Sequence, residues 1–249
     1  MKKLILFTLI LTSLFLYGCK STTDSSQTSV MLILYSYPTE WQESSELQEL
    51  RKATDGQFVS IINPSNGPGY SVNENYTDGI NYLYEQNITI VSYVYTSYGK
   101  RSKQDIYDDI DAYATFYGTK KLSGIFFDEI KLRDSLDEEF VKDISNYAKS
   151  KNFDFIVLNP GTTINQSIID QNYYDIVLTY ENAYEDYVNF TNPLTSSTKT
   201  KQALAVYNCP DKLSYADEIN KAKSMNFDYI YFTIDSKENP WDTIFNFLR

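Results

Sequence analysis

The sequence has no histidine among its 249 residues. This absence excludes Ser-His-Asp triads, Cys-His dyads and metal sites built on imidazole. Any acid–base chemistry must therefore use Asp, Glu, Tyr, Lys or Cys side chains.

Cysteine is also scarce, with only Cys19 and Cys209 present. Lipidation of Cys19 would leave Cys209 alone and exclude an intramolecular disulfide. Because no histidine can activate it, we expect Cys209 to be a buried structural residue and not a nucleophile.

The N-terminal region resembles a bacterial export signal. Lys2 and Lys3 precede an apolar stretch over 4–16, and Leu-Tyr-Gly-Cys at 16–19 resembles a lipobox. The stretch is shorter than the about 20 apolar residues that a membrane span needs. We predict a lipoprotein signal peptide over 1–18, a flexible tether over 19–29 that starts at lipidated Cys19, and one domain over 30–249. The protein would be exported and held at the cell surface or in the periplasm by its lipid alone. An ordinary cleaved signal or an uncleaved helix is the alternative.

Positive charge is under-represented, with 22 basic against 33 acidic residues and a net charge of −11. Such a charge repels nucleic acid and other polyanions, whereas it tolerates neutral glycans and attracts cationic ones. A role in solubility alone is the other explanation.

Strand-like and helix-like segments alternate eight times along the chain. The expected strands cover 31–37, 57–63, 88–96, 122–127, 154–158, 175–180, 202–207 and 229–234. The expected helices cover 41–52, 73–86, 103–117 after an N-cap at Ser102, 135–149, 164–169, 183–188, 214–224 and 241–247. Eight such units predict an α/β fold, a single (β/α)8 TIM-type barrel, with an open doubly wound sheet as the alternative. No glycine-rich phosphate-binding motif follows any strand, so nothing supports nucleotide binding.

Active sites of such barrels lie at the C-terminal ends of the strands. These ends carry carboxylates, amides and aromatic rings with few Arg or Lys residues, a composition typical of carbohydrate sites and not of phosphate sites. The candidate substrate-binding residues are Tyr35, Tyr37, Asn63, Asn66, Tyr93, Thr96, Tyr98, Asn159, Asn182, Tyr207 and Asn208. The 23 tyrosines suit stacking on sugars, although a codon bias explains them equally well. The loop 63–69 could bind sugar hydroxyls through its asparagines or be merely rigid.

Asp128 and Glu129 end the apolar run 123–127 and are the leading catalytic candidates. Two neighbouring carboxylates are costly to bury unless they are used or paired. The alternatives are a helix N-cap or an ion pair with Lys131 or Arg133. Glu181 repeats the pattern two strands later. Because strand residues alternate in direction, we expect only one of Asp128 and Glu129 to face the substrate. Carboxyl groups from strands four and six could lie about 5–5.5 Å apart, as in retaining glycosidases, or about 6.5–9.5 Å apart, as in inverting ones.

Four segments together resemble the spherulin 4 family. They are Tyr35 to Pro38 with Trp41, Ile-Ile-Asn-Pro-Ser-Asn-Gly-Pro-Gly at 61–69, Val-Ser-Tyr-Val-Tyr-Thr-Ser-Tyr-Gly at 91–99, and Gly-Ile-Phe-Phe-Asp-Glu at 124–129. The similarity is clear over about residues 31–160 and then thins to two short matches, at 159–161 and at 180–182.

The resemblance implies a secreted barrel glycoside hydrolase that cuts α-1,4-linked N-acetylgalactosamine in a partly deacetylated exopolysaccharide. It further implies an endo-acting, retaining enzyme, with Asp128 as nucleophile, Glu181 as general acid/base and Glu129 as an electrostatic partner. We expect a monomer that needs no cofactor or metal. The rival hypotheses are a non-catalytic carbohydrate-binding surface lipoprotein on the same scaffold and a purely structural lipoprotein.

Overall fold

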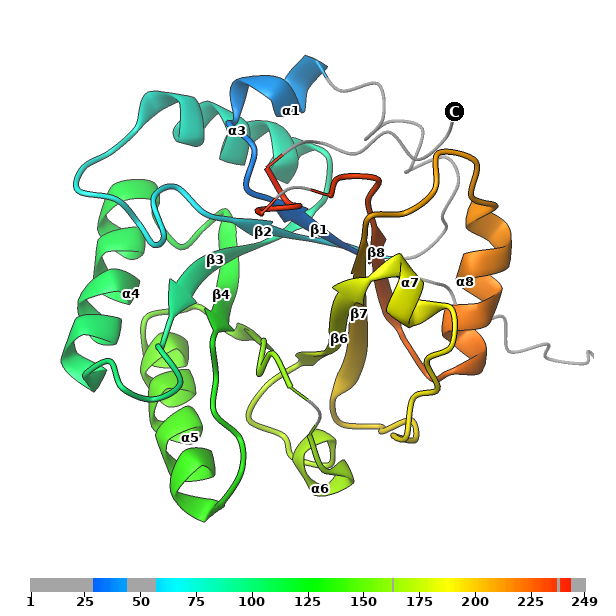
Figure 1. Ribbon diagram of the computed structural model, residues 1–249. Helices are drawn as coiled ribbons and strands as arrows, with labels where there is room; N and C mark the ends of the chain where they lie inside the picture. The colour runs from blue at the N-terminus through cyan, green and yellow to red at the C-terminus, as the bar shows by residue number, and fades with distance from the viewer. Residues whose placement is uncertain (1–28, 44–56, 163, 237, 243–249) are drawn as a thin grey trace, which may run out of the picture.

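Eight parallel strands close into a barrel in sequence order, β1 to β8 (Figure 1). The computed structural model describes residues 29–43, 57–162, 164–236 and 238–242. Closure comes from β1, which pairs with β2 on one side and with β8 on the other, where Ser29 lies opposite Tyr229. The predicted (β/α)8 barrel is therefore confirmed, and the open sheet is wrong.

The strands lie within a few residues of the predicted ranges. They are β1 (Ser29–Leu34), β2 (Phe58–Ile62), β3 (Thr89–Tyr95), β4 (Leu122–Asp128), β5 (Phe155–Leu158), β6 (Ile176–Ala183), β7 (Lys201–Tyr207) and β8 (Tyr229–Phe232). Strand β6 runs three residues past its predicted end at 180, which brings Glu181 into the sheet.

Helices surround the barrel (Figure 1). They are α1 (Thr39–Glu43), α3 (Glu74–Glu85), α4 (Lys103–Tyr117), α5 (Ser135–Ser150), α6 (Gln166–Ile169), α7 (Tyr184–Tyr187) and α8 (Tyr215–Ser224). The predicted cap of α4 is confirmed, since the Ser102 hydroxyl accepts a hydrogen bond from the Asp105 N–H at 3.1 Å. Two predicted helices are described only in part. Residues 44–52 of the helix predicted at 41–52 lie outside the described residues, and so do residues 243–247 of the helix predicted at 241–247.

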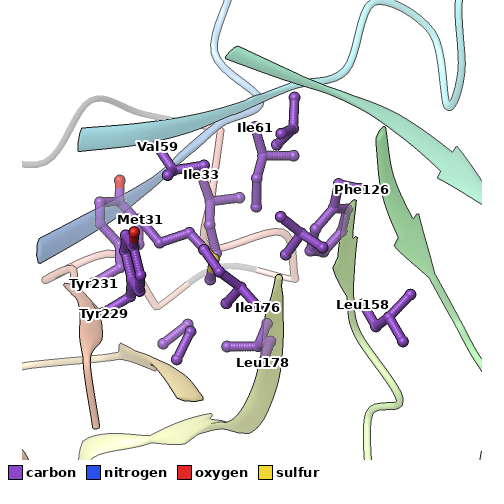
Figure 2. Packing of buried hydrophobic residues seen from close by; sticks show 14 of the residues in the cluster. Met31, Ile33, Val59, Ile61, Phe126, Leu158, Ile176, Leu178, Tyr229 and Tyr231 are labelled. Carbon is purple, nitrogen blue, oxygen red and sulfur yellow. The ribbon is translucent and has the colours of Figure 1, made fainter. Parts of the chain in front are cut away.

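Large apolar side chains fill the barrel. Figure 2 shows inward-pointing residues of several strands meeting at its centre, among them Ile33, Ile61, Phe126 and Leu178. All four are at most 2% exposed. Because the interior is packed solid, a ligand can enter only at the rim.

The predictions for Cys209, for the N-terminal signal and for membrane spans have different outcomes. Cys209 is buried, as expected, and burial raises the pKa of its thiol to about 12, which keeps it protonated and inert. Cys19 and the predicted signal and tether up to residue 28 lie outside the described residues. In the described part of the chain, no helix has the length and apolarity needed to span a bilayer.

Gly124 on β4 lies directly against the backbone of β5 at Phe155. A Cβ atom at this position would lie 1.6 Å from the Phe155 carbonyl oxygen and 2.5 Å from its carbonyl carbon. Backbone cannot move aside as the end of a flexible side chain can, so only glycine fits here.

We expect Gly124→Ala to lower the free energy of unfolding by about 3 kcal/mol, because the strands must separate to admit the methyl group. Urea denaturation monitored by circular dichroism measures this loss. Ser123→Ala is the matched control on the adjacent, half-buried residue, and we expect it to change stability by less than about 1 kcal/mol. Equal stabilities for the two variants would contradict this account of the strand contact.

Candidate functional site

Asp128 lies at the mouth of the barrel because of the pleat of β4. Phe126 points into the interior, and side chains on a strand alternate, so Asp128 faces the same side two residues later (Figure 2). Its Oδ2 accepts a hydrogen bond from the Tyr93 hydroxyl at 2.7 Å, and its Oδ1 accepts one from the Asn159 amide at 2.9 Å. The neighbouring strands β3 and β5 thus hold the carboxylate in place.

Glu181 reaches the mouth because β6 contains an extra residue. The register with β7 shifts between Leu178 and Tyr180, which leaves Thr179 as a bulge. Leu178 points inward, whereas the Tyr180 ring points outward and packs against Phe190, with ring centroids 4.1 Å apart. Without the bulge Tyr180 would point inward and Glu181 outward, since a one-residue slip reverses every later side chain.

One amide joins the two acids. The Asn159 side-chain nitrogen donates to Asp128 Oδ1 at 2.9 Å and to Glu181 Oε2 at 2.7 Å, so these oxygens lie no more than the sum of those lengths, 5.6 Å, apart. The amide oxygen accepts from the Gly161 N–H at 3.0 Å, which defines its orientation. Asp128 and Glu181 therefore form one preorganised pair.

The two carboxyl groups differ in their affinity for a proton. Burial raises the pKa of Asp128, and hydrogen bonds from Tyr93, the Glu129 N–H and Asn159 oppose this rise. Burial also raises the pKa of Glu181, and the negative charge of Asp128 raises it further, against donors on Asn159 and Trp241. Glu181 is exposed as a residue and lines the adjoining pocket, but both of its carboxylate oxygens accept hydrogen bonds from protein, Oε2 from Asn159 and Oε1 from Trp241. The pair is arranged to hold its proton on Glu181 while Asp128 is ionised.

Glu129 has a left-handed backbone conformation, with a φ of 51°, and is no longer part of the strand. The alternation of side-chain direction expected from the sequence therefore ends at Asp128. Its carbonyl oxygen accepts hydrogen bonds from the Thr96 hydroxyl at 2.8 Å and the Tyr98 N–H at 2.7 Å. Burial raises the pKa of Tyr93 and Tyr98, and the charge of Glu129 adds to both rises.

The simpler explanations for this acidic pair are wrong. Lys131 pairs with Asp137 at 2.9 Å, and within the described residues neither Asp128 nor Glu129 forms an ion pair with Lys131 or Arg133. The N-cap of α5 is Asp134, not Asp128 or Glu129.

Several other predicted residues gather near the acids. The Tyr35 ring meets the Tyr93 ring edge-on, with centroids 5.6 Å apart, and the charges of both acids contribute to its raised pKa. Asn159 and Asn182 line a pocket of about 190 Å³ together with Glu181. Tyr207 packs edge-on against Trp241, whose indole N–H bonds Glu181.

Other predicted residues have local partners instead. The Tyr37 hydroxyl accepts hydrogen bonds from Asn73 and Asn75 in a separate pocket beside α3. The Asn63 side chain accepts from the Gly67 N–H at 3.0 Å, a contact that makes its loop rigid. A positive φ places Asn66 and Asn208 in tight turns, both exposed. Whether these four residues bind a ligand stays a prediction.

Sequence reasoning missed Trp241, which it assigned only to a final helix. The indole N–H donates to Glu181 Oε1 at 3.2 Å, and the ring is 5% exposed. The backbone of Trp241 also contacts the residue after β1, because its carbonyl oxygen accepts a hydrogen bond from the Tyr35 N–H at 3.0 Å. Trp241 is one of two tryptophans and the first large aromatic residue after β8, so the sequence alone could have marked it as a candidate site residue.

Asn159→Asp would place a third carboxylate against the other two. The folded state would then retain a proton that the unfolded chain releases, so stability falls as the pH rises. We expect the free energy of unfolding to fall by up to about 1.4 kcal/mol more per pH unit than in the wild type between about pH 5 and pH 7. Urea denaturation at these pH values measures the slope.

Asn87→Asp is the control, because it makes the same change at an exposed turn with a positive φ that Asp tolerates. Its slope should match that of the wild type. If Asn159→Asp also gives the wild-type slope, the amide does not separate two like charges as described.

Comparison with known proteins places this barrel in a family. The curated relative spherulin-4 of Physarum polycephalum is 34% identical over 152 residues, which are 60% of this chain and 44% of that protein, so the match spans less than half of the relative. The crystal structure of Aspergillus clavatus Sph3 in complex with GalNAc has the same fold, with a TM-score of 0.74, 23% identity and coverage of 88% of this chain and 93% of that one. The model of spherulation-specific family 4 matches residues 29–249, that is, the whole barrel. The chain therefore belongs to spherulation-specific family 4.

Proposed function

We propose that this protein is a glycoside hydrolase that cleaves an α-linked, N-acetylgalactosamine-containing exopolysaccharide within the chain and with retention of configuration. The observation that carries the proposal is the pair Asp128 and Glu181, bridged by one amide with their facing oxygens at most 5.6 Å apart, the sum of the two hydrogen-bond lengths. Retaining glycosidases place their carboxyl groups about 5–5.5 Å apart, whereas inverting ones leave about 6.5–9.5 Å for a water molecule.

The proton affinities support a division of roles. Asp128, ionised and held by three donors, attacks the anomeric carbon, while Glu181 gives its proton to the departing glycosidic oxygen. A covalent glycosyl–Asp128 ester results. Glu181, now ionised, takes a proton from water, which attacks the anomeric carbon and releases Asp128.

The nature of the sugar rests on likeness. The Sph3 structure contains GalNAc, and the tyrosines around the acids offer rings of the kind that pack on sugar faces. Internal cleavage of a partly deacetylated polymer follows from the family resemblance. Export and anchoring through Cys19 belong to the same proposal.

We expect Asp128→Asn and Glu181→Gln each to lower kcat at least about 100-fold on a partly deacetylated α-1,4-galactosamine polymer, because each removes one half of the acid–nucleophile pair. Reducing-end release measures turnover, and proton NMR of the first product should show the α-anomer. Unchanged circular dichroism would show that the variants fold.

Asp154→Asn is the matched control, since it neutralises an exposed carboxylate beside the N-terminal end of β5. It should keep wild-type turnover. Full activity in both site variants would overturn the enzymatic proposal, and binding of the polymer without products would favour a non-catalytic carbohydrate-binding protein.

Trp241→Phe should move the alkaline limb of the pH–rate profile. The indole N–H stabilises the charged form of Glu181, so its loss raises the pKa of the group that must stay protonated. We expect activity to persist to higher pH than in the wild type, by up to about one unit, while the acidic limb set by Asp128 stays in place. An alkaline limb that stays or moves to lower pH would contradict the assignment of Glu181 as the acid.

A further inference from the structure

Another pocket, of about 510 Å³, lies between the loops that follow β3, β4 and β5. Its volume falls within the range of about 300–1,000 Å³ that is usual for small-molecule sites. Apolar walls come from Ile130, Leu132 and Pro160, and Tyr98 stands at its edge with 46% of its surface exposed. The mechanism above does not use this pocket.

The pocket borders the acid centre. Thr162 lines both this pocket and the smaller one that contains Glu181. Gly161 lines the smaller pocket, and a Cβ on it would lie 3.5 Å from the hydroxyl of Tyr98, which lines the larger one. Burial raises the pKa of Tyr98, and the charges of Glu129, Asp128 and Glu181 add to this rise. A polymer that crosses the acids from the smaller pocket would meet this one next.

The charge of the pocket is opposite to that of the protein. Lys100, Lys131 and Arg133 line it, and no carboxylate does, although the whole chain carries −11. Asp137 neutralises Lys131 at 2.9 Å. Lys100 and Arg133 are exposed and form no ion pair with any residue of the described part of the chain. Two positive charges therefore remain available beside an aromatic ring.

We propose that this pocket binds an anionic sugar, one that carries a carboxylate, next to the bond that is cut. This deepens the proposed function and rests on it for the position along the polymer. The Arg133 guanidinium matches a carboxylate with two parallel donors, Lys100 adds a point charge, and Tyr98 offers its ring to the sugar face. A deacetylated, cationic residue would be repelled at this position, so an acidic sugar binds here better than a cationic one. The acids can still act on a partly deacetylated polymer where the residue beside the cut is N-acetylated.

The test is binding of monosaccharides to the purified full chain, which requires no turnover. Galacturonate, N-acetylgalactosamine, galactosamine and inorganic phosphate are titrated separately by ligand-observed NMR at low and high salt. We expect galacturonate to bind, to weaken as salt screens the pocket, and to bind at least about tenfold more weakly to the double variant Lys100→Gln with Arg133→Gln. N-acetylgalactosamine binding should be the same in both proteins.

Lys120→Gln is the matched control, since it removes an exposed positive charge from the turn before β4, at the other end of the barrel. It should leave galacturonate binding within about twofold of the wild type, because a charge so far from the pocket is screened. Equal loss in the control and the double variant, galactosamine binding as tightly as galacturonate, or phosphate competing equally well would each overturn the inference.

The two proposals fail separately. If galacturonate binds in a way that depends on Lys100 and Arg133 but no polymer is hydrolysed, the enzymatic proposal is wrong and the proposed site for an anionic sugar stands. Hydrolysis that is lost in Asp128→Asn, together with no galacturonate binding, would keep the enzyme and remove the site.

Discussion

The side-chain amide of Asn159 is the interaction on which the rest of the site depends. Burial of the carboxyl groups raises the pKa of both acids, and the charge of Asp128 raises that of Glu181 further. The amide donates one N–H to each acid and directs its own oxygen to the Gly161 N–H. It therefore sets the separation of the acids without adding charge.

The surroundings of the acids make their roles unequal. Asp128 has Tyr93, Asn159 and the Glu129 N–H as donors, all of which favour its charged form. Glu181 has fewer donors and also experiences the charge of Asp128. A nucleophile must be ionised and a general acid must hold a proton, so this inequality is the property that the proposed chemistry needs.

Polar groups at the mouth divide between binding and support. Thr96 is fully buried and donates a hydrogen bond to the Glu129 carbonyl oxygen, and the Asn63 side chain accepts one from its own loop. Both residues therefore stabilise the loops that form the rim. Tyr98 is exposed and stands between the acids and the basic pocket. Negative and positive regions thus lie side by side on one rim, which suits a substrate whose neighbouring residues differ in charge.

The sequence by itself determined the barrel, because eight apolar runs alternate with amphipathic segments, and it identified Asp128 and Glu181 as acids near strand ends. It could not show that Thr179 is a bulge, since an extra residue is visible only as a shift against the partner strand β7, and this shift turns Glu181 inward. Nor could it bring Trp241 to Glu181, 60 residues away, since that contact exists only because the barrel closes between β1 and β8. Local pattern specifies which residues are strands, and only tertiary packing decides which way their last side chains point.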